Sequence, residues 1–171
     1  MSAPAPIVKT GENIPEATFQ YVPWSDDLED NSFCGLAISL KTSDWKGKRV
    51  LVVAVPGAFT RTCHGQIPGY HKLEKEFKAK GIDEIAVLAT NDAFVQSGWG
   101  RFMGIKDELI FISDTLGKFS AALGLANDKG TGIRAARYVL LISREGTVEK
   151  LLVEPGAGVT LTAAESVLAG L

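Results

Sequence analysis

The residue of greatest chemical interest is Cys63, in the stretch 55-VPGAFTRTCHGQIPGY-70. The chain has two cysteines, and this one follows an apolar run, Val50 to Val55, and opens a helical pattern. Unpaired backbone N–H groups and the positive end of the helix dipole gather at a first helical turn, and both favour a thiolate over a thiol. A small apolar residue filling a strand–helix joint is the alternative. Position alone does not separate the two.

The neighbours of Cys63 limit the chemistry further. Pro56 ends the apolar run and forces a loop, and Thr60, three residues before Cys63, can turn its hydroxyl toward the sulfur. No Cys-x-x-Cys pair occurs, which excludes the dithiol chemistry of that motif. Two histidines and two cysteines are too few to indicate a zinc site. A cysteine hydrolase is a weak alternative. The cysteine and histidine of such an enzyme usually come from distant parts of the chain, whereas His64 directly follows Cys63.

Short aliphatic runs predict the strands that must position this cysteine. Four of them have the length and composition of strands buried on both faces, and a fifth follows a hairpin-type turn at Glu145-Gly146. The five predicted strands are Val50–Val55, Ile85–Ala89, Leu109–Ile112, Tyr138–Ile142 and Val148–Val153.

Helical periodicity fills the intervals between these runs. We predict helices over 67–77, over 95–103 with Asn91-Asp92 as caps, over 116–123, and over 164–171, where Thr162 and Glu165 have capping-box spacing. The order of elements predicts an α/β fold with a mixed central sheet flanked by helices. The crossovers favour parallel pairing, and the hairpin adds antiparallel strands.

Size and charge bound the function. We expect one domain over residues 1–171, with residues 1–15 as a loose N-terminal arm. The net charge of −2 argues against nucleic-acid binding, and the longest apolar run is too short to span a membrane. No secretory signal is recognisable, so we expect a cytoplasmic protein with free or redox-active thiols. A peroxisomal location is the alternative, but Ala169-Gly170-Leu171 matches such a signal only in its last residue.

Pro56, Thr60 and Cys63 together form P-x-x-x-T-x-x-C, and this motif resembles the active site of peroxiredoxins. The context P-G-A-F-T-x-T-C followed by I-P-G-Y is similar to the peroxiredoxin 5 (type II) branch, above all to its fungal alkyl hydroperoxide reductase and peroxisomal allergen members. The similarity continues through VLATNDAFVQSGWG (87–100), LIFISD (109–114), IRAARYVLLI (133–142) and VEPG (153–156). The resemblance implies a thioredoxin-like fold and a thiol-specific peroxidase that needs no metal, haem or flavin.

The resemblance also implies residue roles. Cys63 corresponds to the peroxidatic cysteine, which attacks the O–O bond of hydrogen peroxide or an organic hydroperoxide and becomes a sulfenic acid. Thr60 corresponds to the threonine that hydrogen-bonds the sulfur and the peroxide, and Pro56 to the proline that shields the pocket. Arg137 corresponds to the guanidinium that supports the thiolate, with Arg134 as the second candidate.

Cys34 lies in EDNSFCGL, a polar stretch that indicates a loop. A sulfenic acid needs a second thiol to form a reducible disulfide, but from the residues alone an incidental cysteine is equally compatible. In the fungal branch a cysteine at this place resembles the resolving cysteine, which pairs with the peroxidatic cysteine of the partner subunit. The resemblance therefore implies a homodimer, with thioredoxin as reductant.

Two features depart from the family pattern. Arg61 replaces a proline between the two threonines, and Gln66 stands before Ile67-Pro68 where relatives place a histidine, with the proline one residue earlier. Both departures lie in the first helical turns, so we expect the local geometry to differ there.

Two other classes of function stay open. One is a peroxide sensor or relay, separable from the enzyme only by turnover with thioredoxin. The other is a catalytically silent binding or chaperone module, which a slow, unperturbed thiol would support.

Phe59, Trp99 and Phe119 are candidates for a dimer face, although aromatic residues at helical spacing more often belong to the core.

Overall fold

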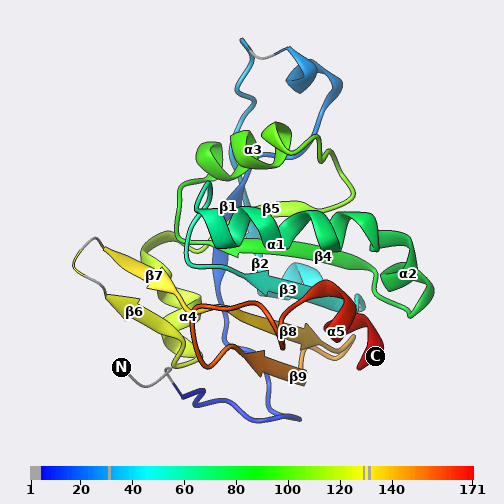
Figure 1. Ribbon diagram of the computed structural model, residues 1–171, viewed down its shortest axis with the longest axis vertical. Helices are drawn as coiled ribbons and strands as arrows, with labels where there is room; N and C mark the ends of the chain where they lie inside the picture. Colours follow the sequence, from blue (N-terminus) through cyan, green and yellow to red (C-terminus); the bar gives the residue numbers. More distant parts are fainter. Residues whose placement is uncertain (1–4, 31, 129, 131) are drawn as a thin grey trace.

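A seven-stranded mixed sheet forms the centre of the computed structural model, which describes residues 5–30, 32–128, 130 and 132–171 (Figure 1). The strand order is β2-β1-β5-β4-β3-β8-β9, and β6 and β7 form a separate two-stranded ribbon. β3 pairs in parallel with β4 and β4 with β5, while β8 runs antiparallel to both β3 and β9. The strands are β1 Thr18–Tyr21, β2 Ile38–Lys41, β3 Val50–Ala54, β4 Glu84–Ala89, β5 Ile110–Ser113, β6 Ala126–Asp128, β7 Ile133–Ala135, β8 Tyr138–Ile142 and β9 Val148–Val153.

Helices cover both faces of this sheet (Figure 1). Side chains of α1, α2, α3 and α5 pack on one face, and those of α4 and of a short 3₁₀ segment pack on the other. The α-helices are α1 Arg61–Lys72, α2 Glu74–Ala79, α3 Ala93–Phe102, α4 Lys118–Ala122 and α5 Ala164–Ala169, and the 3₁₀ helices are η1 Asp26–Glu29, η2 Thr42–Trp45 and η3 Thr115–Gly117. No helix in the described ranges is long and apolar enough to cross a membrane.

The central strand β3 shows why the fold is stable around the site. All five of its residues are buried, and successive side chains alternate between the two faces. Leu51 and Val53 join the cluster beneath α1, and Val50 and Val52 join the cluster on the opposite face. Each fully buried side chain of this size contributes about 1.5–3 kcal/mol, so the strand end that precedes Cys63 is held from both sides.

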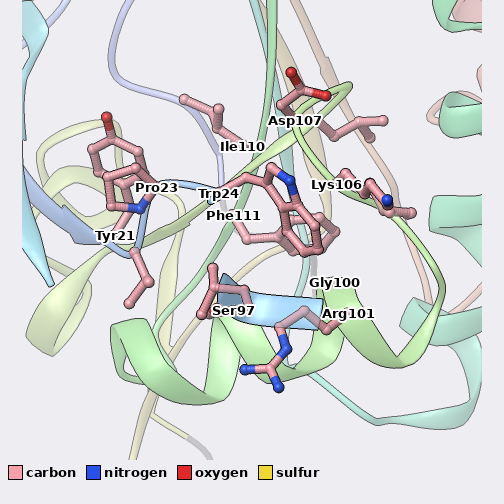
Figure 2. A pocket seen from close by; sticks show the side chains of 14 residues that line it. Tyr21, Pro23, Trp24, Ser97, Gly100, Arg101, Lys106, Asp107, Ile110 and Phe111 are labelled. Carbon is pink, nitrogen blue, oxygen red and sulfur yellow. The ribbon is translucent and has the colours of Figure 1, made fainter. Parts of the chain in front are cut away.

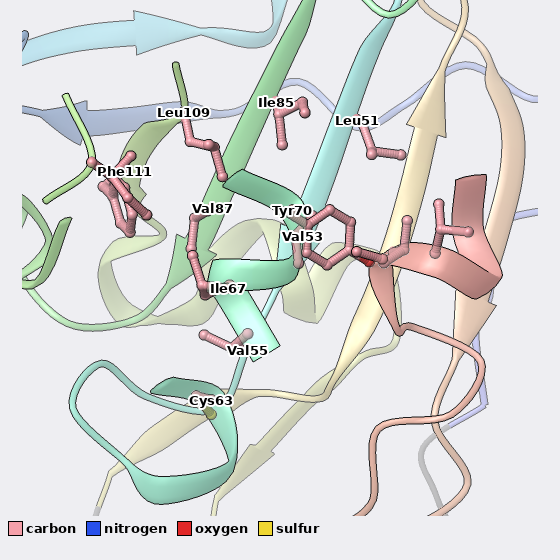
Figure 3. Close-up of a cluster of buried hydrophobic side chains, with 14 of the residues drawn as sticks. Leu51, Val53, Val55, Cys63, Ile67, Tyr70, Ile85, Val87, Leu109 and Phe111 are labelled. Atoms are coloured by element: carbon pink, nitrogen blue, oxygen red, sulfur yellow. The ribbon is translucent and has the colours of Figure 1, made fainter. Parts of the chain in front are cut away.

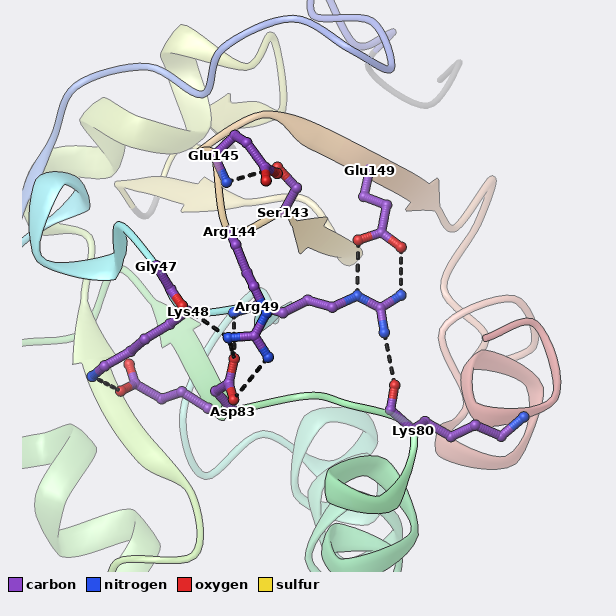
Figure 4. A network of polar contacts seen from close by, with 10 residues as sticks. Gly47, Lys48, Arg49, Lys80, Asp83, Ser143, Arg144, Glu145 and Glu149 are labelled. Atoms are coloured by element: carbon purple, nitrogen blue, oxygen red, sulfur yellow. Dashed lines mark hydrogen bonds and ion pairs between the residues drawn. The ribbon is translucent and has the colours of Figure 1, made fainter.

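At the end of β3 that lies away from Cys63, a network of polar contacts connects this strand to its neighbours (Figure 4). Arg49 donates to Glu149 and to the Lys80 carbonyl, and Asp83 accepts from the Arg49 amide and pairs with Arg144. The two ends of one strand therefore differ: charged groups tie one end to its neighbours, and an apolar loop follows the other.

The five predicted strands are all present within one or two residues, and their parallel and antiparallel pairing is confirmed. The helix predicted over 67–77 is wrong as one element, because the chain breaks at Leu73 into α1 and α2. β1, β2, β6 and β7 were not predicted; they are short, and each buries at most one residue.

Two further predictions need correction. Thr162 does not cap α5; Ala163 holds the cap position without a side-chain bond, and the Thr162 hydroxyl bonds Glu154 instead. The prediction of a loose arm does not hold for residues 7–14. Their backbone forms hydrogen bonds with the backbone of Leu123, Gly146 and Val148. Residues 1–4 of that arm lie outside the described residues.

Candidate active site

The loop that joins β3 to α1 is held in a fixed and partly strained conformation. The Asn91 side chain, just beyond β4, accepts from the Ala58 amide at 2.9 Å. Phe59 has a φ of 59°, a left-handed conformation that costs a residue other than glycine about 1–3 kcal/mol. Surrounding contacts must hold such a conformation, so the loop sets the start of α1 with little freedom.

Cys63 faces inward from the first turn of α1 with an exposed fraction of 1%. The helix buries Cys63, Gln66, Ile67 and Tyr70, a spacing that places all four on one face. Figure 3 shows the labelled Cys63 at the end of the apolar cluster formed by α1 and the central strands. Packing of Ile67 and Tyr70 therefore fixes the rotation of the helix that carries the thiol.

Arg137 lies beside this thiol because of the register between β3 and β8. Ala54 pairs with Tyr138, so the residue before Tyr138 lies beside the start of the Cys63 loop. The guanidinium is 7% exposed, and its Nη2 lies 3.5 Å from Cys63 Sγ. The guanidinium therefore donates a hydrogen bond toward the sulfur.

Gln66 connects Arg137 to the loop before α5. Its Oε1 accepts from Arg137 Nη1, and its Nε2 donates to the Thr162 carbonyl and hydroxyl oxygens at 2.8 and 3.1 Å. The Thr162 hydroxyl in turn donates to Glu154 at 3.0 Å, which leaves its oxygen as an acceptor for Gln66. The amide of Gln66 can therefore point only one way, with its carbonyl toward the guanidinium.

Glu154 is the anionic end of this hydrogen-bonded chain and is 5% exposed. Burial alone would raise the pKa of its carboxyl, but hydrogen bonds from the amides and hydroxyls of Thr162 and Thr160 outweigh it and lower the pKa. The carboxylate thus stays charged near neutral pH. The sequence analysis did not identify Gln66 or Glu154 as site residues. The i, i+3 spacing of Cys63 and Gln66 could have indicated that Gln66 shares the buried face of the helix.

The other predicted site residues also lie around the β3–α1 loop. Pro56 is half-buried, and its carbonyl accepts from Arg134 Nη1 at 3.0 Å. The Thr60 hydroxyl donates to the Gly57 carbonyl at 2.9 Å, so its oxygen can still accept a hydrogen bond from a ligand. The structure thus places Arg137 beside Cys63 and bonds Arg134 to the loop backbone. The predicted bond from Thr60 to the sulfur does not occur among the described contacts, because the Thr60 hydroxyl bonds Gly57.

Cys34 lies apart from this cluster, in the segment between β1 and β2. It is an exposed free thiol, and it lines a groove against α3 together with Phe94, Arg101 and Phe102. Cys63 is not among the residues of that groove. The predicted partner of Cys63 is therefore accessible to another protein chain, whereas Cys63, at 1% exposure, is not.

The same segment also covers a cavity of about 240 Å³ on the other side of α3 (Figure 2). Its walls include Trp24, Leu28 and Phe111, and it contains neither cysteine. The cavity shows that the Cys34 segment rests on α3 through an incompletely filled contact. Within the described ranges, no three His, Cys, Asp or Glu side chains gather as metal ligands would.

Several known proteins resemble this chain along most of its length. The Redoxin family model matches residues 9–168. Peroxiredoxin Pen c 3 of Penicillium citrinum is 42% identical over 79% of this chain and 81% of its own, and Peroxiredoxin-2C of Arabidopsis thaliana is 36% identical over 98% and 99%. The crystal structure of reduced Prx3 from Vibrio vulnificus in complex with H₂O₂ superposes with a TM-score of 0.83 at 33% identity, covering 96% of this chain and 99% of that one.

The loop and helix that hold a buried cysteine against an arginine thus occur in a chain that matches the family along almost its whole length. The fold is thioredoxin-like, as the sequence predicts. The chain belongs to the Redoxin family, as a peroxiredoxin of the type II, peroxiredoxin 5-like branch.

Proposed function

We propose that Cys63 is the peroxidatic cysteine of this peroxiredoxin, acting on hydrogen peroxide and alkyl hydroperoxides. The observation that carries the proposal is the 3.5 Å contact between Cys63 Sγ and the buried Arg137 guanidinium at the first turn of α1. The thiolate attacks one peroxide oxygen; an S–O bond forms, the O–O bond breaks, and the leaving oxygen takes a proton to become water or an alcohol.

The surrounding groups stabilise this step through charge and orientation. Arg137 balances negative charge on the sulfur and on the departing oxygen, and its Nε, buried without a hydrogen-bond partner among the described residues, is a further donor for a peroxide oxygen. The Thr60 oxygen accepts a hydrogen bond from the peroxide O–H, and Pro56 shields the sulfur from water. No cofactor takes part in this scheme.

Resolution of the sulfenic acid is assigned to Cys34 of the partner subunit in a homodimer. The Cys63 sulfenic acid and the Cys34 thiol form a disulfide and release water, and thioredoxin then reduces the disulfide. The exposure of Cys34 supports this assignment. So do the exposed aromatic side chains near the site, Phe59 at 53% and Phe102 at 72%, which a second subunit would cover.

The test is non-reducing intact mass, measured seconds after one equivalent of hydrogen peroxide is added to the reduced protein. We expect a covalent dimer whose mass is that of two chains less the hydrogens of two disulfides, with Cys63–Cys34 linkages in its peptide map. A monomer with one added oxygen at Cys63 would keep the peroxidase and remove Cys34 as the resolving residue. An unchanged mass would overturn the role of Cys63.

A further inference from the structure

Arg61, the first residue of α1, is an exposed cation for which its own subunit supplies no partner. Its side chain forms no hydrogen bond or ion pair among the contacts of the described residues, and the first turn of α1 contains no acidic residue. The positive end of the helix dipole also disfavours a cation at this position. A negative group from another chain would therefore be stabilised beside Arg61 and would offset its charge.

The segment between β1 and β2, which carries Cys34, has the opposite charge. Four exposed carboxylates lie in η1 and directly after it, at Asp26, Asp27, Glu29 and Asp30. Glu29 forms an ion pair with Lys106, and Asp30 lies within electrostatic range of Arg101. These two carboxylates are therefore balanced by cations of the same subunit.

Asp26 and Asp27 are the two carboxylates that remain. Neither side chain has a hydrogen bond or an ion pair among the described contacts, although Lys106 acts on Asp26 through space. The segment between β1 and β2 extends beyond α3 (Figure 1), so both carboxylates are open to a second chain. One subunit thus presents an unpaired cation at the start of α1 and an unpaired acidic pair on the segment that carries Cys34.

The 3₁₀ helix η1 packs directly beside the residue that follows Cys34. A Cβ placed on Gly35 would lie 3.2 Å from Leu28 Cδ2, which belongs to η1. Because Leu28 directly follows Asp27, the acidic pair lies near the thiol. Charges act over about 10 Å in ordinary buffers, so the pair attracts a cation that approaches Cys34.

Exposed aromatic side chains connect the groove of Cys34 with the start of α1. Phe102 lines that groove, and its ring lies 5.8 Å from the ring of Phe59. Phe59 precedes Arg61 by two residues, and both aromatic side chains are more than half exposed. The cation, the thiol and the aromatic pair therefore belong to one face of the subunit, and such a face can pair with a second copy of itself.

We propose that Asp26 and Asp27 of one subunit pair with Arg61 of the partner subunit, and that this contact guides Cys34 toward the partner's Cys63. In a twofold dimer each chain offers both charges, so the contact forms twice. The inference rests on the proposed function, in which the Cys63 sulfenic acid and the Cys34 thiol form an S–S bond and release water. Opposite charges across an interface mainly speed encounter and fix orientation, so the contact governs the rate at which this bridge forms.

The test uses two forms of the chain, so that a single bridge can form between them. The first form carries Cys34→Ser and supplies Cys63, and the second carries Cys63→Ser and supplies Cys34. The two forms are mixed and left to exchange subunits before hydrogen peroxide is added in an amount equal to Cys63. Non-reducing intact mass after rapid quenching distinguishes the sulfenic acid from the covalent dimer, so bridge formation is measured apart from the peroxide step.

The rate of bridge formation should depend on salt. Raising the salt concentration from about 0.01 M to about 1 M shortens the range of electrostatic forces from roughly 30 Å to about 3 Å. We expect the bridge to form about two- to tenfold more slowly at the higher concentration, as exposed ion pairs would give.

Charge reversal identifies the residues that make the contact. At low salt, Arg61→Glu in the first form should slow the bridge by about two- to tenfold, and Asp26→Lys with Asp27→Lys in the second form should slow it equally. Both changes together should restore the rate, and this rescue acts between chains because each change lies in a different one. The matched control is Lys75→Glu, the same change of charge on an exposed residue of α2, which should leave the rate unchanged.

The results that overturn this contact differ from those that overturn the proposed function. Equal rates in every charge variant and at both salt concentrations, with the bridge still formed, overturn the contact and leave Cys34 as the resolving residue. A sulfenic acid that persists without a bridge refutes the resolving role of Cys34 and the contact with it. In the wild type, loss of two hydrogens from a single chain would place the bridge within one subunit and would also overturn the contact.

Discussion

The two cysteines of the chain differ in almost every physical respect. Cys63 is buried on a helix that follows the most deeply covered strand of the sheet, with a guanidinium 3.5 Å from its sulfur. Cys34 is exposed on the segment between β1 and β2 and lines an open groove against α3. The difference separates two requirements: attack on a peroxide needs donors fixed around the sulfur, whereas disulfide exchange needs a thiol that another molecule can reach.

Fixed donors matter more than ionisation for the first requirement. An unperturbed thiol is already a few per cent ionised near neutral pH, so full ionisation gains only about thirtyfold. A lower proton affinity also reduces the intrinsic nucleophilicity of the sulfur. Any larger acceleration must come from groups that stabilise charge as the O–O bond breaks, and the buried Arg137 beside Cys63 is such a group.

The strongest test of this difference between the two cysteines replaces each sulfur with oxygen. Cys63→Ser should slow consumption of the first equivalent of peroxide by at least ~10³-fold, because the thiolate nucleophile is gone. Cys34→Ser should consume that equivalent at the wild-type rate and then stop, because thioredoxin finds no disulfide. Stopped-flow peroxide consumption followed by a thioredoxin-coupled assay measures both.

Either of two outcomes would contradict this division of labour. Wild-type peroxide consumption by the Cys63 variant would show that the buried cysteine is not the nucleophile. Normal recycling of the Cys34 variant by thioredoxin would show that another route, such as direct reduction of the sulfenic acid, replaces resolution by Cys34.

A smaller effect should separate the two arginines near the site. Arg137→Leu removes the donor to Cys63 Sγ, and loss of one such donor commonly costs ~10²–10³ in rate. Arg134→Leu removes a bond to the Pro56 carbonyl and touches the sulfur only through the loop, so we expect a loss of about tenfold or less. The second-order rate constant with hydrogen peroxide measures the difference.

Arg137→Lys sharpens the same test. A lysine keeps the charge but lacks the two separate guanidinium nitrogens that donate to Gln66 and to Cys63. An activity close to wild type would show that charge alone matters, and a larger loss in Arg134→Leu than in Arg137→Leu would reverse the assignment.

The fold could be predicted largely because its centre is aliphatic and continuous along the chain. Runs such as Val50–Val55 and Tyr138–Ile142 are buried on both faces, and burial of this kind is visible in composition. β1 and the ribbon strand β7 escaped prediction for the opposite reason, since β1 buries one residue of four and β7 one of three.

The site was predictable only where local sequence carries it. The motif around Cys63 identifies the cysteine, but the role of Gln66 depends on Thr162 and Arg137, which lie 96 and 71 positions further along the chain. Thr162 shows how a local pattern can mislead. Its spacing to Glu165 predicts a capping box, but its hydroxyl donates a hydrogen bond to Glu154 instead. Hydrogen bonds between distant segments leave no local pattern.

The smallest effect concerns Glu154, the buried anion behind Arg137. Because the folded pKa lies below its usual value near 4.5, its stabilisation is present above that value and is lost as pH falls through the lower folded pKa. Glu154→Gln should lower the free energy of unfolding by about 2–3 kcal/mol at pH 7 and slow peroxide reduction by less than about tenfold. The matched control is Glu149→Gln, at the far end of the sheet (Figure 4).

The half-exposed pair between Glu149 and Arg49 should contribute no more than about 1 kcal/mol, so the two variants separate a buried anion from a surface one. Urea unfolding at pH 7 and at pH 3.5 measures both. The gap between wild type and Glu154→Gln should shrink at the lower pH, since protonation removes the charge that the threonines bind. A gap that stays constant would mean that Glu154 acts through packing, and the hydrogen-bonded chain to Arg137 would then lose its anionic anchor.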